Sequence, residues 1–89
     1  MENFNNAAAY GFDLQIEFIK ERMKEKKITQ KELAKKIGVN QSTLVRNFKK
    51  ETEMYHTTFL KICGALEINP FLIPKELNKD EIWKRIFFN

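Results

Sequence analysis

The sequence predicts an all-α fold of five helices with no sheet. Apolar residues recur at helical spacing in several segments, two helix starts carry capping sequences, and the chain has only three glycines and two prolines. Eighty-nine residues suffice for one hydrophobic core and leave no room for a second. We therefore expect a flexible N-terminal arm over residues 1–9, a helical domain over residues 10–74 and a C-terminal helix over residues 75–89.

The first predicted helix runs from Asp13 to about Lys26. The apolar positions that give it helical spacing are Phe12, Ile16, Ile19 and Met23. Leu14 and Phe18 form a second stripe, so this helix is apolar on more than one side. We expect it to pack against both the domain core and the C-terminal segment.

Capping residues predict a second helix after Ile28. The Thr29 hydroxyl can accept from the N–H of Glu32 while the Glu32 carboxylate accepts from the N–H of Thr29, which makes a capping box. The apolar stripe of this helix is Leu33, Ala34 and Ile37. Gly38 follows where a left-handed backbone is needed to end the helix.

A third helix is predicted from Gln41 to about Phe48, capped by Asn40 and buried through Leu44. Only a short turn at Gly38 separates it from the helix before. Two short helices joined through one glycine cross steeply, and this is the helix-turn-helix arrangement.

The remaining chain predicts two more helices. Thr57 or Thr58 can cap the fourth. Its apolar stripe is Phe59, Ile62, Cys63 and Leu66, with Cys63 as a buried filler. Pro70 would end it, and residues 71–73 would return apolar side chains to the core. Residues 75–89 are predicted to form the fifth helix. The predicted core is Ile19, Met23, Leu33, Ala34, Ile37, Val39, Leu44, Phe48, Ile62, Cys63 and Leu66.

Composition and charge favour a cytoplasmic protein with an anionic partner. No apolar run approaches the roughly 18 residues of a membrane span, and the first residues lack the pattern of a signal peptide. One cysteine and one histidine leave no set of metal ligands or catalytic triad, so we expect no cofactor and no enzyme. Residues 20–50 contain eleven Lys and Arg and three Glu, a net charge of +8, whereas the rest of the chain carries −4. A polyanion binder needs such segregated charge, although mixed Lys and Glu can also serve only to solvate helices.

The most specific motif is residues 30–48, Q-K-E-L-A-K-K-I-G-V-N-Q-S-T-L-V-R-N-F. It combines a small residue at Ala34, Gly38 four residues later, and Val39 and Leu44 at the seam between helices. It resembles the helix-turn-helix of the phage repressor/Cro (XRE-like) family, and residues 29–72 are similar to the lambda-repressor-like DNA-binding domain. Asn47 departs from the motif, which usually has an apolar residue there. This weakens the packing match at the end of residues 41–48, although Phe48 beside it can supply the bulk.

The resemblance implies a sequence-specific binder of double-stranded DNA, a transcriptional regulator that acts as a repressor. Residues 41–48 would be the helix in the major groove. The residues that would contact bases are Gln41, Ser42 and Arg46. The residues that would contact the DNA backbone are Gln30, Asn40, Thr43, Lys49, Lys50 and Tyr55. Gln30 would also brace Gln41, and Thr52 matches a loop position that can touch a base. The chemistry agrees, because glutamine can bind adenine with two hydrogen bonds and arginine can bind guanine likewise.

Residues of the fifth helix predict a homodimer on a palindromic operator. Its broad apolar stripe, which would form the dimer interface, is Ile82, Trp83, Ile86 and Phe87. Two alternatives stay open: this helix could fold back over Leu14 and Phe18 and complete a monomer, or the chain could be a DNA-binding antitoxin with a toxin partner. A pure protein-interaction module would need no excess positive charge, which argues against it.

Overall fold

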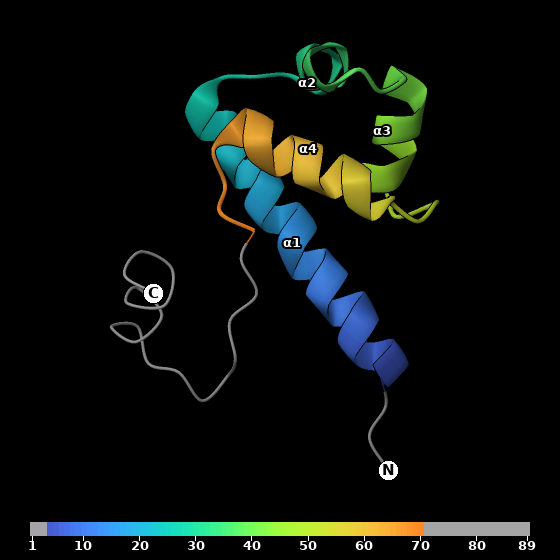
Figure 1. Cartoon of the computed structure of the whole chain (residues 1–89). Coiled ribbons are helices and arrows are strands. Elements are labelled where there is room, and N and C mark those ends of the chain that lie inside the picture. Colours follow the sequence, from blue (N-terminus) through green and yellow to red (C-terminus); the bar gives the residue numbers. More distant parts are fainter. Residues whose placement is uncertain (1–3, 71–89) are drawn as a thin grey trace, which may run out of the picture.

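The computed structural model describes residues 4–70 of the chain, and these residues form four helices (Figure 1). The helices are α1 (Phe4–Lys26), α2 (Gln30–Ile37), α3 (Gln41–Phe48) and α4 (His56–Leu66). No strand occurs among them, so the all-α prediction is confirmed for this part of the chain. The fifth helix predicted over residues 75–89, with the proposed dimer residues Ile82, Trp83, Ile86 and Phe87, lies outside the described residues.

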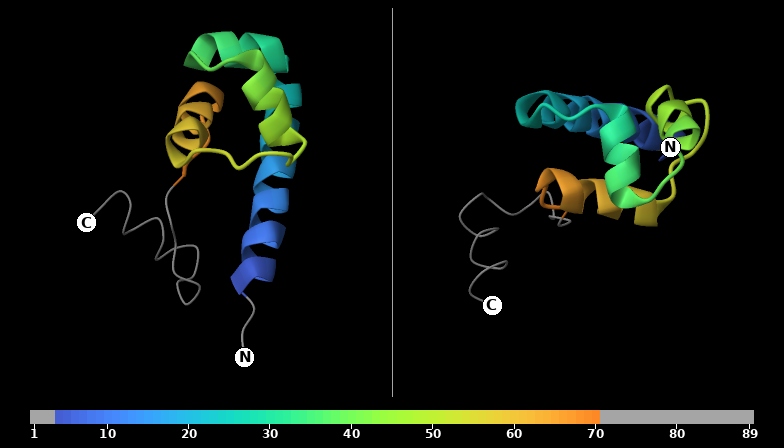
Figure 2. Two further views of the ribbon diagram at one scale, coloured as in Figure 1. Left: turned by 90° about the vertical axis from the view of Figure 1, so that its right-hand side faces the viewer. Right: turned by 90° about the horizontal axis from the view of Figure 1, so that it is seen from above.

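α2 and α4 connect the four helices. Helix α4 contacts both α1 and α2, and α2 also contacts α3. The first half of α1 extends beyond the other three helices in Figure 1 and in the left view of Figure 2. None of the helices in residues 4–70 is long and apolar enough to cross a membrane.

The core lies where α1, α2, α3 and α4 meet. Its buried apolar residues are Ile16, Ile19, Met23, Leu33, Ala34, Leu44, Phe48, Ile62, Cys63 and Leu66. Each large aliphatic or aromatic side chain removed from water contributes about 1.5–3 kcal/mol. Nine of these ten belong to the predicted core, and Ile16 is the buried residue that the predicted core lacks. Ile37 and Val39 are only half-buried, because they flank the turn at Gly38 and lie at the edge of the core.

The start of α1 corrects the sequence prediction. A flexible arm was expected over residues 1–9 and a helix from Asp13, but residues 4–9 are helical and α1 begins at Phe4. Residues 4–10 are all exposed, so burial does not explain this extension. Ala7, Ala8 and Ala9 have the highest intrinsic helix propensity, which favours a helix even where no side chain is buried.

The start of α4 also differs from the prediction. Neither Thr57 nor Thr58 caps the helix; Tyr55 occupies the N-cap position and makes no side-chain cap hydrogen bond. Thr58 lies in the first turn of α4 and its side chain is buried, so it belongs to the helix and does not precede it as a cap. The other end of α4 comes before Pro70, as expected, but Glu67 makes the turn with a left-handed φ of 57°.

Candidate nucleic-acid interface

The start of α2 and its end at the turn before α3 are both built as the sequence predicts. The N–H of Glu32 donates to Thr29 Oγ1 at 3.1 Å, and Glu32 Oε1 accepts from the N–H of Thr29, also at 3.1 Å. Hydrogen bonds from the backbone and then the hydroxyl of Thr29 lower the pKa of Glu32. Gly38 ends α2 with φ 73° and ψ 33°. A Cβ at Gly38 would have open space around it, so glycine is favoured by backbone conformation and not by crowding.

Asn40 sets the start of α3. Its Oδ1 accepts from the N–H of Ser42 at 3.0 Å and from the Ser42 hydroxyl at 2.8 Å, which confirms the predicted cap. The oxygen of Asn40 is thus engaged, while its amide N–H groups donate to no other side chain or backbone oxygen of residues 4–70. The Ser42 hydroxyl hydrogen is also used, and the lone pairs of its oxygen stay available to accept a hydrogen bond.

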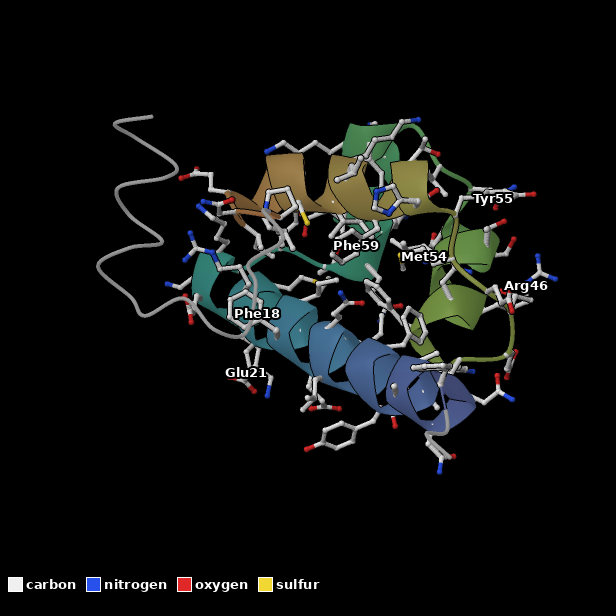
Figure 3. The ribbon with its side chains drawn as sticks, turned by 60° about the horizontal axis from the view of Figure 1, so that its bottom comes forward. Phe18, Glu21, Arg46, Met54, Tyr55 and Phe59 are labelled. Atoms are coloured by element: carbon white, nitrogen blue, oxygen red, sulfur yellow. The ribbon has the colours of Figure 1, made fainter. Side chains whose placement is uncertain are left out.

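The three residues predicted to contact bases all belong to α3. Gln41, Ser42 and Arg46 are all exposed, and Ser42 and Arg46 are four residues apart, which puts them on one helix face. Arg46 makes no ion pair with any residue of the described segment. Figure 3 shows Arg46 and Tyr55 at one end of the molecule and Phe18 and Glu21 of α1 at the other. The face is therefore open to a partner.

The residues predicted to contact the DNA backbone are more dispersed. Lys49 is exposed at the C-cap of α3, and Tyr55, just before α4, is 80 % exposed. Gln30 and Thr43 are half-buried on α2 and α3. No hydrogen bond joins Gln30 to Gln41 within residues 4–70, so the bracing of Gln41 stays a prediction.

Lys50 differs from the other predicted backbone-contacting residues because its side chain already has a partner within the chain. Its Nζ lies 2.8 Å from Asp13 Oδ1 of α1, and its backbone is left-handed, with φ 63°. This ion pair connects the α3–α4 loop to the first half of α1. A phosphate would have to compete with Asp13 for the Lys50 ammonium.

Asn47 is the residue whose role the sequence did not reveal. It is 3 % exposed, and its Nδ2 donates to Thr52 Oγ1 at 2.9 Å and to the backbone oxygen of Glu53 at 3.3 Å. Phe48 beside it is buried and supplies the apolar bulk, as expected, while the Asn47 amide holds the loop that follows α3. Its departure from the apolar residue of the motif was the available signal, since a buried amide must find hydrogen-bond partners.

Unpaired positive charge concentrates on α2 and α3. The four ion pairs of the described segment use Arg22, Lys24, Lys26 and Lys50. In that segment, no cation of α2 or α3 takes part in an ion pair, and those cations are Lys31, Lys35, Lys36 and Arg46. Carboxylates thus neutralise part of the charge of α1, whereas the cations of α2 and α3 have no carboxylate within ion-pair distance among residues 4–70.

Comparison with protein families agrees with this geometry. A family model described as a Cro/C1-type HTH DNA-binding domain matches residues 19–71, more than half of the chain. The match runs from the second half of α1 through α4 and contains the whole capped turn. The chain matches no curated protein and no solved structure.

Proposed function

The chain belongs to the Cro/C1-type HTH family of DNA-binding domains, and we propose that it represses transcription by inserting α3 into the major groove of an operator. The observation that carries this proposal is the exposed side of α3. Gln41, Ser42 and Arg46 are exposed there, and Arg46 makes no ion pair in the described segment. The unpaired cations of α2 and α3 support it, because phosphate contacts supply much of the affinity for DNA.

Each of these residues, and the cap residue Asn40, makes a different contact with DNA in this proposal. Arg46 binds a guanine through O6 and N7, and Gln41 binds an adenine through N6 and N7. Ser42 accepts a hydrogen bond from a base amino group, because its own hydroxyl hydrogen is directed to Asn40. Asn40 donates to a phosphate through the amide N–H groups that its cap leaves unused.

Phosphate contacts around this face fix the position of α3 without reading sequence. We assign them to Gln30, Asn40, Thr43, Lys49, Lys50 and Tyr55. Lys49 and Tyr55 are the best presented, since both are exposed, whereas Lys50 must first leave Asp13.

A homodimer completes the proposal, because each chain offers one recognition helix and useful specificity against genomic competition takes two half-sites. Ile82, Trp83, Ile86 and Phe87 would form the interface. A two-fold axis there would place the two α3 helices roughly 34 Å apart, in successive major grooves.

Selection from random double-stranded oligonucleotides with the full chain tests this function. We expect an enriched motif with two inverted half-sites, about 10 base pairs between centres. Enrichment of a single half-site would remove the dimer and keep the DNA-binding function. Recovery of no motif above the starting pool would contradict sequence-specific binding altogether.

A further inference from the structure

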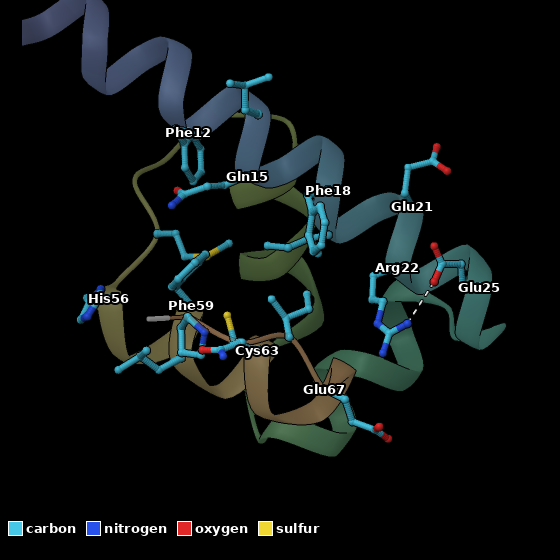
Figure 4. A pocket seen from close by; sticks show the side chains of 17 residues that line it. Phe12, Gln15, Phe18, Glu21, Arg22, Glu25, His56, Phe59, Cys63 and Glu67 are labelled. Carbon is cyan, nitrogen blue, oxygen red and sulfur yellow. Dashed lines mark hydrogen bonds and ion pairs between the residues drawn. The ribbon is translucent and has the colours of Figure 1, made fainter. Parts of the chain in front are cut away.

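An open apolar groove of about 1220 Å³ lies between α1 and α4. Figure 4 shows Phe12 and Phe18 of α1 facing Phe59 and Cys63 of α4 across it. Arg22 closes one end, where its Nε donates to the backbone oxygen of Leu66 at 2.9 Å. The groove is therefore a defined feature between two connected helices.

Large apolar side chains line this groove and remain exposed. Leu14 is 53 % exposed, Phe18 59 % and Leu60 41 %. All three line the same groove, and small domains rarely leave a large apolar patch without an occupant. Phe18 and Glu21, which line one end of the groove, lie at the opposite end of the molecule from Arg46 (Figure 3), so DNA on α3 would leave that end of the groove uncovered.

We propose that residues 71–77 of the same chain occupy this groove. Pro70 is itself part of the groove wall, so the chain enters the segment at the edge of the groove. A residue spans at most about 3.6 Å, which keeps residues 71–73 within roughly 11 Å of Pro70. This tether gives the segment a high effective concentration at the groove and favours it over any free partner.

The chemistry of the segment matches the lining. Its sequence is Phe-Leu-Ile-Pro-Lys-Glu-Leu, with four large apolar residues and no net charge. Phe71, Leu72 and Ile73 come directly after the wall residue Pro70 and can cover Leu14, Phe18 and Leu60. The proposal leaves Ile82, Trp83, Ile86 and Phe87 to the dimer and does not depend on DNA binding.

Thermal unfolding of the full-length chain tests the proposal with a matched pair on one helix. Phe18 and Tyr10 are both exposed aromatic residues of α1 in the described segment, at 59 % and 67 %, but only Phe18 lines the groove. Serine costs the same helix propensity at both positions. We expect Phe18→Ser to lower the Tm by about 4–8 °C or more and Tyr10→Ser to change it by much less. Equal Tm values for the two variants would overturn the proposal.

The occupant is identified by variants of the segment itself. Phe71→Ser should lower the Tm like Phe18→Ser, and the double variant should lose less than the sum, because both changes disrupt one contact. An unchanged Tm in Phe71→Ser would exclude the segment. A second copy would be the occupant instead if the Tm of wild type rises with protein concentration and the Tm of Phe18→Ser is lower and independent of concentration. If Phe18→Ser does not fold, Leu14→Ala provides the same comparison with a smaller change.

Discussion

The side-chain amide of Asn47, buried at the end of α3, donates to the hydroxyl of Thr52 at 2.9 Å across the loop that follows. The same nitrogen reaches the backbone oxygen of Glu53 at 3.3 Å. The loop is also connected to α1 through Lys50 and Asp13. Three polar contacts thus hold the segment that carries Lys49 and Tyr55 beside the exposed face of α3.

A double-mutant cycle measures the Asn47 contact. Asn47→Leu restores the apolar residue usual in the motif, and Thr52→Val removes the accepting hydroxyl at nearly constant volume. Each single change should lower the free energy of unfolding, and the two should couple by about 0.5–1.5 kcal/mol, the net value of one hydrogen bond. Urea unfolding gives the four values. Additive effects would mean that the hydrogen bond contributes nothing to stability.

Gly38 and Gly64 offer opposite responses to the same substitution. Gly38 has a φ of 73°, so Gly38→Ala should cost about 1–2 kcal/mol through backbone strain alone. Gly64 lies inside α4, and a Cβ there meets nothing within 4 Å. Gly64→Ala should therefore raise the free energy of unfolding by about 0.4–1 kcal/mol. The two signs are read from urea unfolding, and a neutral Gly38→Ala would show that the turn does not need a left-handed residue.

These contacts show which parts of the fold the sequence could predict. The capping box at Thr29, the turn at Gly38 and the cap at Asn40 are local, since each joins residues two or three positions apart or depends on one backbone conformation. Sequence spacing and the caps therefore identified the helix pair, and the family resemblance pointed to the residues of its exposed face. The apolar periodicity likewise predicted nearly all of the buried core.

Contacts without a local signature escaped prediction. The first turns of α1 bury no side chain, so no apolar spacing marks them as helical. The N-cap of α4 is Tyr55, which makes no capping hydrogen bond that a sequence pattern could reveal. The ion pair of Lys50 with Asp13 joins residues far apart in the chain, and only the tertiary fold brings them together.

Stability should fall in acid partly through Glu32. Hydrogen bonds from Thr29 lower the pKa of this carboxyl in the folded chain below its ordinary value. The unfolded state therefore takes up the proton first, and the stabilisation is present above the unfolded pKa and is lost as pH falls through the folded pKa. Glu32→Gln should reduce the slope of stability against pH in this acid range. Glu17→Gln, at an exposed position of α1, is the control, and equal slopes in both variants would contradict the role of Thr29.

Lys49 and Lys50 should differ in their salt dependence. Lys49→Ala should weaken binding to every DNA sequence and flatten the slope of log affinity against log salt by about 0.9, the effect of one lost phosphate contact. Lys50→Ala should do less, because Asp13 competes for its charge. Asp13→Asn should then strengthen binding by freeing Lys50. Titrations of each variant with DNA at several salt concentrations measure these differences. If Asp13→Asn binds DNA more weakly than wild type, the ion pair itself supports the DNA-bound loop.

Sequence reading by the exposed face of α3 is tested most directly by the affinity of Arg46→Ala for the selected site and for a scrambled one, measured by fluorescence anisotropy. Loss of one guanine contact should weaken binding to the selected site by about 5- to 150-fold, equivalent to about 1–3 kcal/mol, and relax the preference at one base pair. Binding to the scrambled site should change far less. Lys24→Ala removes one exposed positive charge from α1 and should keep the full preference. If Arg46→Ala binds the selected site as wild type does and selects the same motif, α3 does not read DNA through this face.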